Sequence, residues 1–289
     1  MKDLCAVSDT TDATQTRVYV LGASGKVGRL LRAVWRAGQA NGLEFIPIFR
    51  QTPEDAEGLQ WRPEQDLPNV PKARAVLALW GVTGADPAAL QQNVDLAIRA
   101  QEFGQSVGAD RVLHCSSAAV YRPEDHPLGE AARLDPPTPY GAAKLAMERA
   151  LQDAPGPTPV ILRIGSVAGA ESLFGNMRPG GSIHLHRFAD GQGPSRSYIA
   201  PQDLARVIHA LITSPEARGI YNVGAPKGVR MQDLAQAAAC QITWAQPPKG
   251  VPQNVVLDTT RLQGLCALGA GASDARQIIA DVKATRVWP

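Results

Sequence analysis

The chain has 289 residues, 44% of them hydrophobic, which is enough for one large α/β domain or two smaller lobes with a substantial core. A formal net charge of +2 is too balanced for a nucleic-acid binder or a polybasic membrane surface. No stretch reaches the length of a membrane span, and residues 1–16 lack the basic start and apolar middle of a signal peptide. We therefore expect a cytoplasmic protein that binds neither nucleic acid nor membrane, with residues 1–16 as a flexible tail.

The first informative stretch follows this tail. Val18–Leu21 has the pattern of a short buried strand, Gly22, Gly25 and Gly28 follow at intervals of three, and Arg29–Ala40 has the pattern of a helix. Because glycine lacks a Cβ, the backbone can turn sharply and approach a pyrophosphate, which free N–H groups and the helix dipole attract. Between a strand and a helix, these glycines predict a dinucleotide site, and a glycine-rich turn without a ligand is the alternative.

The next expected strand, Leu43–Phe49, contains Pro47, which lacks the N–H that a sheet needs. In a dinucleotide-binding fold the residue at the end of this strand faces the adenosine ribose, where an acid would bind the 2′-hydroxyl of NAD. This chain has Arg50 there, and its charged, planar fork suits a 2′-phosphate. Arg50 therefore favours NADP over NAD, and a solvated loop arginine is the alternative.

Strands and helices alternate along the rest of the chain. Asp86 and Pro87 give a capped start to a helix that runs to about Gly104. The other expected strands are Leu59–Trp61, Ala73–Trp80, Arg111–Cys115, Val160–Ile164, His184–Phe188, Gly219–Val223 and Val255–Leu257. The other expected helices are Tyr140–Gln152, Pro201–Thr213, Met231–Ala239, Thr259–Leu265 and Ser273–Val282. This alternation predicts an α/β fold with a doubly wound parallel sheet of the Rossmann type.

Ligands of such sheets bind outside the carboxyl ends of the strands, where the glycine turn, Gly81, Ser117 and Gly165 all fall. The later sequence has many glycines and few periodic stretches. We expect an NAD(P)-binding Rossmann domain over residues 17–169, completed by parts of 197–224, and mainly a small C-terminal substrate-binding lobe over 170–289.

Tyr140 and Lys144 form the second informative motif, because residues four apart lie on one face of a helix. Tyrosine, with a pKa of about 10, is a poor base at neutral pH, and a nearby ammonium lowers that pKa. Ser117, at the end of an earlier strand, can polarise a substrate oxygen. Together these side chains would manage a proton while a nicotinamide carries the hydride. A surface tyrosine beside a solvated lysine is the alternative.

Several stretches of the chain follow the order of motifs in one family. They are Gly22-Ala-Ser-Gly25-Lys-Val-Gly28, Ser116-Ser117-Ala-Ala-Val-Tyr121, Tyr140-Gly-Ala-Ala-Lys144, Leu162-Arg163 before Gly169, Ser197-Tyr198-Ile199 ahead of Asp203-Leu-Ala, and Tyr221-Asn-Val-Gly224. On these stretches the chain resembles the extended short-chain dehydrogenases/reductases of the NAD-dependent epimerase/dehydratase type.

The resemblance implies a Rossmann domain that binds NAD(P), a smaller substrate lobe, and Ser117, Tyr140 and Lys144 as the catalytic residues. In relatives the serine directly before the Ala-x-Val-Tyr stretch is catalytic, which selects Ser117 over Ser116. Asn93 matches a helix asparagine near the site, and many relatives form homodimers through the helices that carry Asn93 and Tyr140.

The turn, the strand ends and the family motifs together give the candidate binding residues. Predicted cofactor contacts are Gly22, Ser24, Gly25, Lys26, Val27, Gly28, Arg50, Leu79, Trp80, Gly81, Asn93, Tyr140, Lys144 and Val167. Predicted substrate contacts are Tyr121, Asn176, Arg178 and Arg196, of which the arginines suit an anion such as a diphosphate. The four cysteines form no CxxC pair and the histidines have no partner at a fixed spacing, so we expect no metal site.

The chain also departs from the family pattern. Trp61-Arg62 replaces an Asp that often touches adenine, and Ala78-Leu79-Trp80-Gly81 replaces the usual His-Leu-Ala-Gly, which places a large Trp80 near the cofactor. The stretch from Arg163 to Gly169 lacks the Asn that relatives use to contact a nucleotide sugar.

The leading hypothesis is an NAD(P)-dependent oxidoreductase of the epimerase/dehydratase type that acts on a secondary alcohol or ketone, with Tyr140 as acid/base. A nucleotide sugar is the candidate substrate that the family suggests. Arg50 and the altered loop favour the alternative, an NADPH-dependent carbonyl reductase of a non-sugar substrate. A further alternative is a non-catalytic NADP-binding regulator, which the intact Ser117, Tyr140 and Lys144 oppose.

Overall fold

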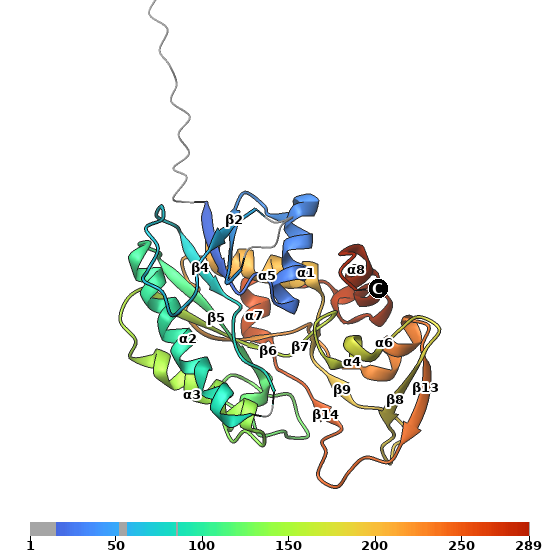
Figure 1. The fold of residues 1–289 in the computed structure, drawn as a ribbon. Helices are drawn as coiled ribbons and strands as arrows, with labels where there is room; N and C mark the ends of the chain where they lie inside the picture. Colours follow the sequence, from blue (N-terminus) through green and yellow to red (C-terminus); the bar gives the residue numbers. More distant parts are fainter. Residues whose placement is uncertain (1–15, 52–56, 85, 289) are drawn as a thin grey trace, which may run out of the picture.

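The computed structural model describes residues 16–51, 57–84 and 86–288, so nearly all of the expected tail lies outside the described residues. The described chain forms a central sheet of seven parallel strands in the order β11-β6-β5-β4-β1-β2-β3 (Figure 1). These strands are β1 Arg17–Leu21, β2 Glu44–Phe49, β3 Leu59–Gln60, β4 Ala75–Ala78, β5 Arg111–Ser117, β6 Thr158–Ile164 and β11 Gly219–Val223. The predicted doubly wound parallel α/β sheet is confirmed.

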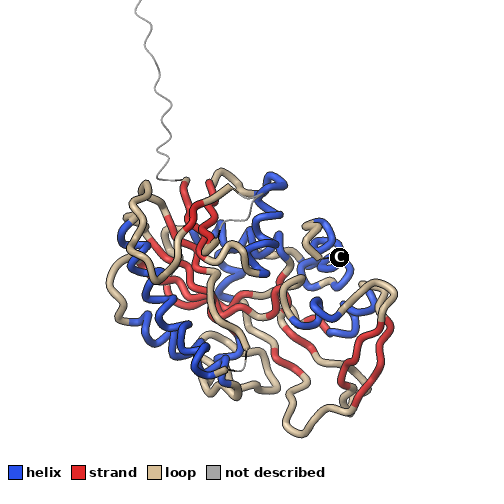
Figure 2. Tube along the Cα trace, in the orientation of Figure 1, coloured by secondary structure: helices blue, strands red, loops and turns tan. Residues whose placement is uncertain are grey.

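Helices cover both faces of this sheet (Figures 1 and 2). Because side chains alternate along a strand, Val18 and Val20 of β1 face one side and Tyr19 faces the other. The first side packs against α1 (Lys26–Val34) and α5 (Pro201–Thr213). The second side packs against α2 (Pro87–Ser106), which in turn contacts α3 (Pro139–Gln152). The result is a three-layer arrangement with a hydrophobic core on each side of the sheet.

The helix starts follow from local chemistry. The Asp86 carboxylate accepts a hydrogen bond from the Ala88 N–H, as expected for a cap before Pro87. The helix expected from Arg29 already begins at Lys26, because Gly25 has an extended backbone and serves as its N-cap. It ends in a π-helical turn at Trp35–Gln39.

Pro47 does lie inside β2, and the neighbouring strands explain how. β1 pairs with β2 along its length, whereas β3 pairs only with Ile48 and Phe49. Pro47 therefore lies where one side of β2 has no partner strand among the described residues, so the missing N–H costs no ladder hydrogen bond on that side.

The chain leaves the sheet after β6 and forms a lobe of short elements (Figure 1). The paired strands are β7 (Ser166–Val167) with β10 (Tyr198–Ile199), β8 (Ser182–His186) with β13 (Gln241–Ala245), and β9 (Ser195–Arg196) between β12 (Val229–Arg230) and β14 (Asn254–Val255). The helices here are α4 (Ser172–Asn176), α6 (Met231–Ala237) and α8 (Ala275–Ala284), whereas α7 (Thr260–Leu265) packs against β11 of the central sheet. Between these segments, α5 and β11 return to the sheet, where β11 pairs with β6.

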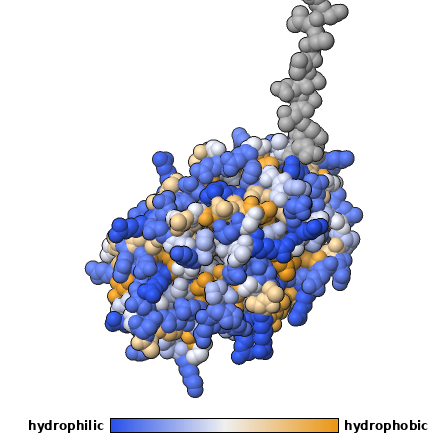
Figure 3. All heavy atoms as spheres, turned by 180° about the vertical axis from the view of Figure 1, so that it is seen from behind, coloured by the Kyte–Doolittle hydropathy of each residue, from blue (hydrophilic) through white to orange (hydrophobic). Residues whose placement is uncertain are grey.

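Hydrophilic side chains cover most of the face seen in Figure 3, with apolar atoms scattered between them. Among the described residues, Leu134 is the one large hydrophobic side chain that is classed as exposed, at 38%. A search of the same residues finds no helix with the length and apolar character needed to cross a membrane.

Candidate active site

The glycine turn lies at the carboxyl end of β1. Gly22 has a φ of +80°, a backbone conformation that residues with a side chain rarely adopt. A Cβ at this position would also lie 2.5 Å from the backbone nitrogen of Trp80, so there is no space for a side chain. A Cβ on Gly28 would lie 2.6 Å from the Ala23 oxygen, so this glycine lets α1 pack closely against the turn. Gly25 ends the turn, and the first N–H groups of α1 follow it.

A cavity of about 430 Å³ opens beside this turn, and we name it the turn cavity. Its lining brings together seven of the predicted cofactor residues, namely Gly22, Ser24, Gly25, Arg50, Leu79, Trp80 and Gly81. The sequence analysis did not select its other lining residues, Ile48, Trp61, Val82 and Thr83. Trp61 was detectable as a departure from the family pattern, whereas the others carry no distinguishing chemistry.

A second cavity, of about 270 Å³, holds the predicted catalytic residues, and we name it the tyrosine cavity. Ser117, Tyr140 and Lys144 line it together with Val27 and Val167. Leu79, Trp80, Gly81 and Thr83 line both cavities, so the two adjoin along the carboxyl edge of the sheet. This is the edge at which α/β sheets bind their ligands.

Lys144 is buried, and its Nζ donates a hydrogen bond to the Cys115 carbonyl oxygen at 2.9 Å. The Nζ lies 6.0 Å from the centroid of the Tyr140 ring. Burial lowers the pKa of the Lys144 ammonium. Burial also raises the pKa of the Tyr140 phenol, and the hydrogen bond with Ser117 opposes that rise. Desolvation is therefore the dominant effect on the phenol, and Ser117 supplies the opposing contact. The lowering expected from Lys144 together with a nicotinamide ring stays a prediction.

Ser116 and Ser117 occupy different environments. The Ser116 hydroxyl donates to the buried Glu148 carboxylate at 2.5 Å, and Glu148 also pairs with the buried Arg163 at 2.7 Å. Arg163 donates to the Tyr121 hydroxyl, which donates to Asn222. Ser116 thus belongs to an internal polar network.

Ser117 accepts a hydrogen bond from the Ala119 N–H and lines the tyrosine cavity. It also lines a third cavity, of about 240 Å³, which we name the loop cavity. Both serines line the tyrosine cavity, but the Ser116 hydroxyl is engaged with Glu148, whereas Ser117 also lines the loop cavity.

Three predicted cofactor residues do not line the turn or tyrosine cavity: Lys26, Gly28 and Asn93. Asn93 is 1% exposed, and its amide bonds to the Val82 N–H, the Val82 carbonyl and the Leu90 carbonyl. Its Oδ1 would lie 3.0 Å from a Cβ on Gly81. In this structure Asn93 holds the loop after β4 in place rather than facing the cleft.

The predicted substrate residues are divided in the same way. Arg196 and Tyr121 line the loop cavity, but the Tyr121 hydroxyl is engaged in the buried network. Arg196 donates to the carbonyls of Ser195, Gln253 and Pro252. Asn176 and Arg178 are exposed and line none of these three cavities. The structure therefore does not gather these four residues into one site.

Glu171 lines the tyrosine cavity, and the sequence analysis missed it. Its carboxylate caps α4 through the N–H groups of Leu173 and Phe174. Burial raises the pKa of the Glu171 carboxyl, and the two N–H groups oppose that rise. A Glu followed by a short helix carries no family motif, so only the fold reveals this position.

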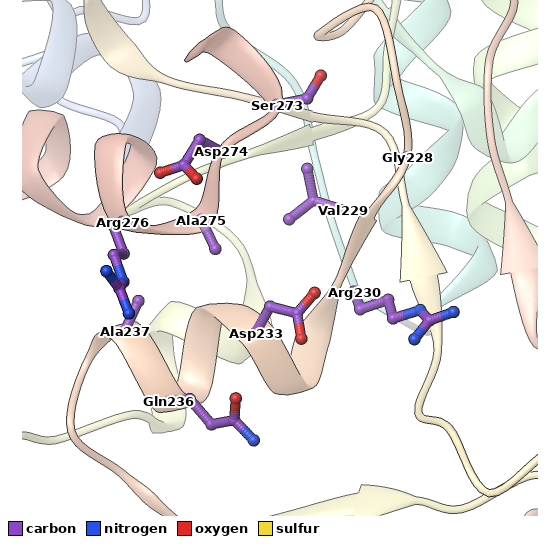
Figure 4. A pocket seen from close by; sticks show the side chains of 10 residues that line it. All are labelled: Gly228, Val229, Arg230, Asp233, Gln236, Ala237, Ser273, Asp274, Ala275 and Arg276. Atoms are coloured by element: carbon purple, nitrogen blue, oxygen red, sulfur yellow. The ribbon is translucent and has the colours of Figure 1, made fainter. Parts of the chain in front are cut away.

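A larger cavity, of about 490 Å³, lies between α6 and α8, away from the carboxyl edge of the sheet (Figure 4). This cavity is bordered by Asp233 and Gln236 of α6, by Asp274 directly before α8, and by Arg276 on α8. The Asp274 carboxylate already caps α8 through the Gln277 N–H. None of the predicted site residues lies in this cavity.

Among the residues that the structure describes, no three His, Cys, Asp or Glu side chains form a group that could hold a metal ion. Cys115, Cys240 and Cys266 are free thiols, and Cys5 lies outside the described residues.

Comparisons with known proteins agree with this architecture. A model of the NAD dependent epimerase/dehydratase family matches residues 18–224. A UDP-glucose 4-epimerase of Azospirillum brasilense is 48% identical over 68 residues, which is 22% of this chain and 20% of that protein. The chain therefore matches only about a fifth of this curated relative.

Two solved structures illustrate the likeness in fold. A short-chain dehydrogenase/reductase superfamily protein from Agrobacterium tumefaciens with bound NAD gives a TM-score of 0.73 at 21% identity, covering 93% of this chain and 97% of that one. The UDP-glucuronic acid 4-epimerase of Bacillus cereus, in complex with UDP-glucuronic acid and NAD, gives 0.70 at 17% identity, covering 93% and 99%.

A parallel Rossmann-type sheet with a glycine turn at its carboxyl edge defines a dinucleotide-binding fold of the extended short-chain dehydrogenase/reductase type. Because the family model covers most of the chain, the protein belongs to the NAD dependent epimerase/dehydratase family. The predicted family is confirmed.

Proposed function

We propose that the protein is an NAD(P)-dependent oxidoreductase that acts on a secondary alcohol or ketone, with Tyr140 as the acid/base group. One observation carries the proposal: Ser117, Tyr140 and Lys144, from β5 and α3, line one cavity that adjoins the cavity of the glycine turn. Both lie at the edge of the sheet where this fold class binds dinucleotides.

The residues of the turn cavity fit a dinucleotide. The backbone of Gly22 and Gly25 lines the cavity without side chains, and α1 begins directly after Gly25. The N–H groups at the start of this helix suit a pyrophosphate. Trp80 adds an indole to the wall of the cavity. Lys144 would hold a ribose hydroxyl, and Val27 and Val167 would border the nicotinamide end. When bound, the dinucleotide supplies or accepts the hydride.

The side chains of the tyrosine cavity would handle the proton. Because burial raises the pKa of Tyr140, the phenol is protonated at neutral pH, the form that donates a proton to a carbonyl oxygen during its reduction. The Ser117 hydroxyl, which hydrogen-bonds Tyr140, would orient that same oxygen. Lys144 would keep positive charge near the phenol oxygen and so stabilise the phenolate that remains after the proton has moved to the carbonyl oxygen.

Tyr140→Phe tests this assignment. We expect kcat to fall by about 100- to 10,000-fold, because the variant keeps the ring but loses the transferable proton. Binding of the dinucleotide, measured by calorimetry, should remain. Tyr221→Phe is the matched control, since Tyr221 lies on β11 and lines none of the three cavities. Equal turnover of Tyr140→Phe and wild type would refute Tyr140 as the acid/base group.

A nucleotide sugar is the first candidate substrate, because two of the three relatives named above carry UDP-sugars in their names or titles. Incubation with UDP-sugars and a catalytic amount of NAD(P) should then yield the epimer without net oxidation or reduction of the cofactor. If none of a broad set of alcohols, ketones and UDP-sugars is turned over, the result would favour the alternative that the protein is a non-catalytic NADP-binding regulator.

A carbonyl reductase of a non-sugar substrate is the second candidate, and one observation favours it. The cations that line the tyrosine and loop cavities are Lys144 and Arg196, and both donate to backbone carbonyls rather than standing free for a diphosphate. In this case NADPH absorbance should fall in proportion to the ketone reduced. A homodimer through α2 and α3 remains a further prediction, which light scattering tests.

We also propose a preference for NADP over NAD. Arg50 follows β2 and lines the turn cavity, and no Asp or Glu is among the described residues that line it. Arg50→Ala should weaken NADPH binding by about 10- to 100-fold, because a charge-assisted contact to the 2′-phosphate is lost, and should leave NADH binding nearly unchanged. An equal loss for both cofactors, measured by calorimetry, would rule out the phosphate contact.

A further inference from the structure

Two tryptophans from different loops meet at the wall of the turn cavity. Trp61 follows β3 and Trp80 follows β4, and their ring centroids lie 5.7 Å apart at an interplanar angle of 38°. Both residues depart from the family pattern, and together they replace small and acidic residues by a continuous aromatic surface. The cavity therefore has a wall whose chemistry differs from that of its relatives.

Trp61 is held firmly in this wall. It is 3% exposed, its ring stacks on Phe103 with centroids 5.2 Å apart, and the Arg99 guanidinium lies 5.5 Å from the ring centroid. Its Nε1 donates to the Asp66 carbonyl at 2.9 Å. Because these contacts fix the indole on several sides, Trp61 acts as a rigid support behind Trp80.

Trp80 is only half-buried and lines both the turn and tyrosine cavities. Its Nε1 is nevertheless buried and has no hydrogen-bond partner in the structure. A buried N–H without an acceptor is costly, and most such groups in folded proteins are paired. Because this nitrogen is shielded from the cavity, a ligand can touch the indole only through its carbon atoms.

The same cavity offers no carboxylate to recognise a base by its edge. Arg50 is the one charged side chain among the described residues that line it. An acid after β3 would accept a hydrogen bond from the exocyclic amine of adenine, and Trp61 stands at that place. What remains for a purine is the face of an indole, against which bases stack favourably.

We propose that Trp80 is a binding residue for the adenosine half of the dinucleotide. Its indole face, supported by Trp61, stacks on the purine. The inference rests on the proposed function, because the class of ligand comes from it. It goes further by replacing edge recognition of adenine with stacking.

Calorimetric titration of the full chain with ADP-ribose and its 2′-phosphate tests the proposal without any turnover. Trp80→Phe keeps an aromatic face, so affinity should stay within about threefold of wild type. Trp80→Ala loses that face, and affinity should fall by at least about tenfold. Trp244→Phe is the matched control, since Trp244 lies on β13, outside the three site cavities, and its affinity should equal that of wild type.

The outcomes separate the two proposals. If wild type binds ADP-ribose and both folded Trp80 variants bind it equally well, the role of Trp80 is overturned while the proposed function stands. If wild type binds no adenosine ligand, both are overturned. Circular dichroism confirms folding, and Trp80→Leu, which also lacks the aromatic face, replaces the alanine variant if that variant does not fold.

The hypoxanthine analogue of NADPH gives a second measurement on the unaltered protein. Hypoxanthine keeps the purine face and lacks the exocyclic amine, so a stacking wall should bind it within about threefold of NADPH. A loss larger than about tenfold would show recognition of the amine and would overturn the stacking assignment.

Discussion

Gly141 directly follows the candidate catalytic tyrosine, and at this position even one methyl group has no room. A Cβ there would collide with the Ala119 carbonyl oxygen and lie 2.8 Å from the Pro136 Cβ. The sequence predicted the Tyr140–Lys144 pair from helical spacing alone. It could not explain the glycine, because the tightest contact is with Ala119, which lies in a turn more than twenty residues earlier in the chain.

Gly141→Ala should lower the free energy of unfolding by about 1–3 kcal/mol, since overpacking forces α3 away from the Ala118–Val120 turn. Turnover should fall as well, because Tyr140 moves with the helix. Urea denaturation checks the first effect. In Gly264→Ala, the control on α7, a Cβ meets nothing within 4 Å, and stability should change by less than about 1 kcal/mol.

At the scale of whole elements, the periodic segments were predictable and the buried charges were not. Helix Pro201–Thr213 and strand Gly219–Val223 match the expected ranges, because their apolar spacing is regular. Glu148 and Arg163, however, look like solvated charges in the sequence. In the structure they join α3 to β6 as a buried pair, with side chains 4% and 2% exposed.

Glu148→Gln should lower the free energy of unfolding by about 3 kcal/mol, because it leaves the Arg163 charge buried without a counter-charge. Asp135→Asn is the control, since it breaks the exposed pair of Asp135 and Arg122, and should cost less than about 1 kcal/mol. Similar losses for both variants, measured by thermal unfolding, would contradict the importance of burial.

For the whole molecule, the sequence predicted the strands of the central sheet and two strands of the lobe that overlap β8 and β14, but it missed β7, β9, β10, β12 and β13. Several of these strands have only two residues, too few to show any periodicity. The contacts that join distant parts were also hidden. Asp281 of α8 accepts a hydrogen bond from the Gln202 N–H at the start of α5, and its other oxygen is buried without a partner.

Burial raises the pKa of Asp281 to about 6 from its ordinary value of 3.8, and the charge of Asp203 adds to the rise. The folded protein therefore binds this proton more tightly than the unfolded chain does, so this group's contribution to stability falls as the pH rises from about 4 to about 6, and stays low above that. Asp281→Asn removes this dependence and keeps an oxygen that can accept the Gln202 bond.

We expect Asp281→Asn to be more stable than wild type by about 2 kcal/mol at pH 7.5 and nearly equal at pH 4. Urea denaturation at both pH values measures the difference, with the exposed Asp233→Asn as control. A stability gain that is the same at both pH values would assign the effect to packing instead of ionisation.

The pairing of β11 with β6 has a consequence for how the protein is made. The ribosome releases the first six strands of the sheet well before residues 219–223 emerge. During that interval β6, which contains the apolar Val160 and Leu162, is an edge strand without a partner on one side, and other chains can pair with it. Synthesis must pass residue 223, well into the lobe, before this edge of the sheet is covered, so a nascent chain that pauses before that point is exposed to aggregation.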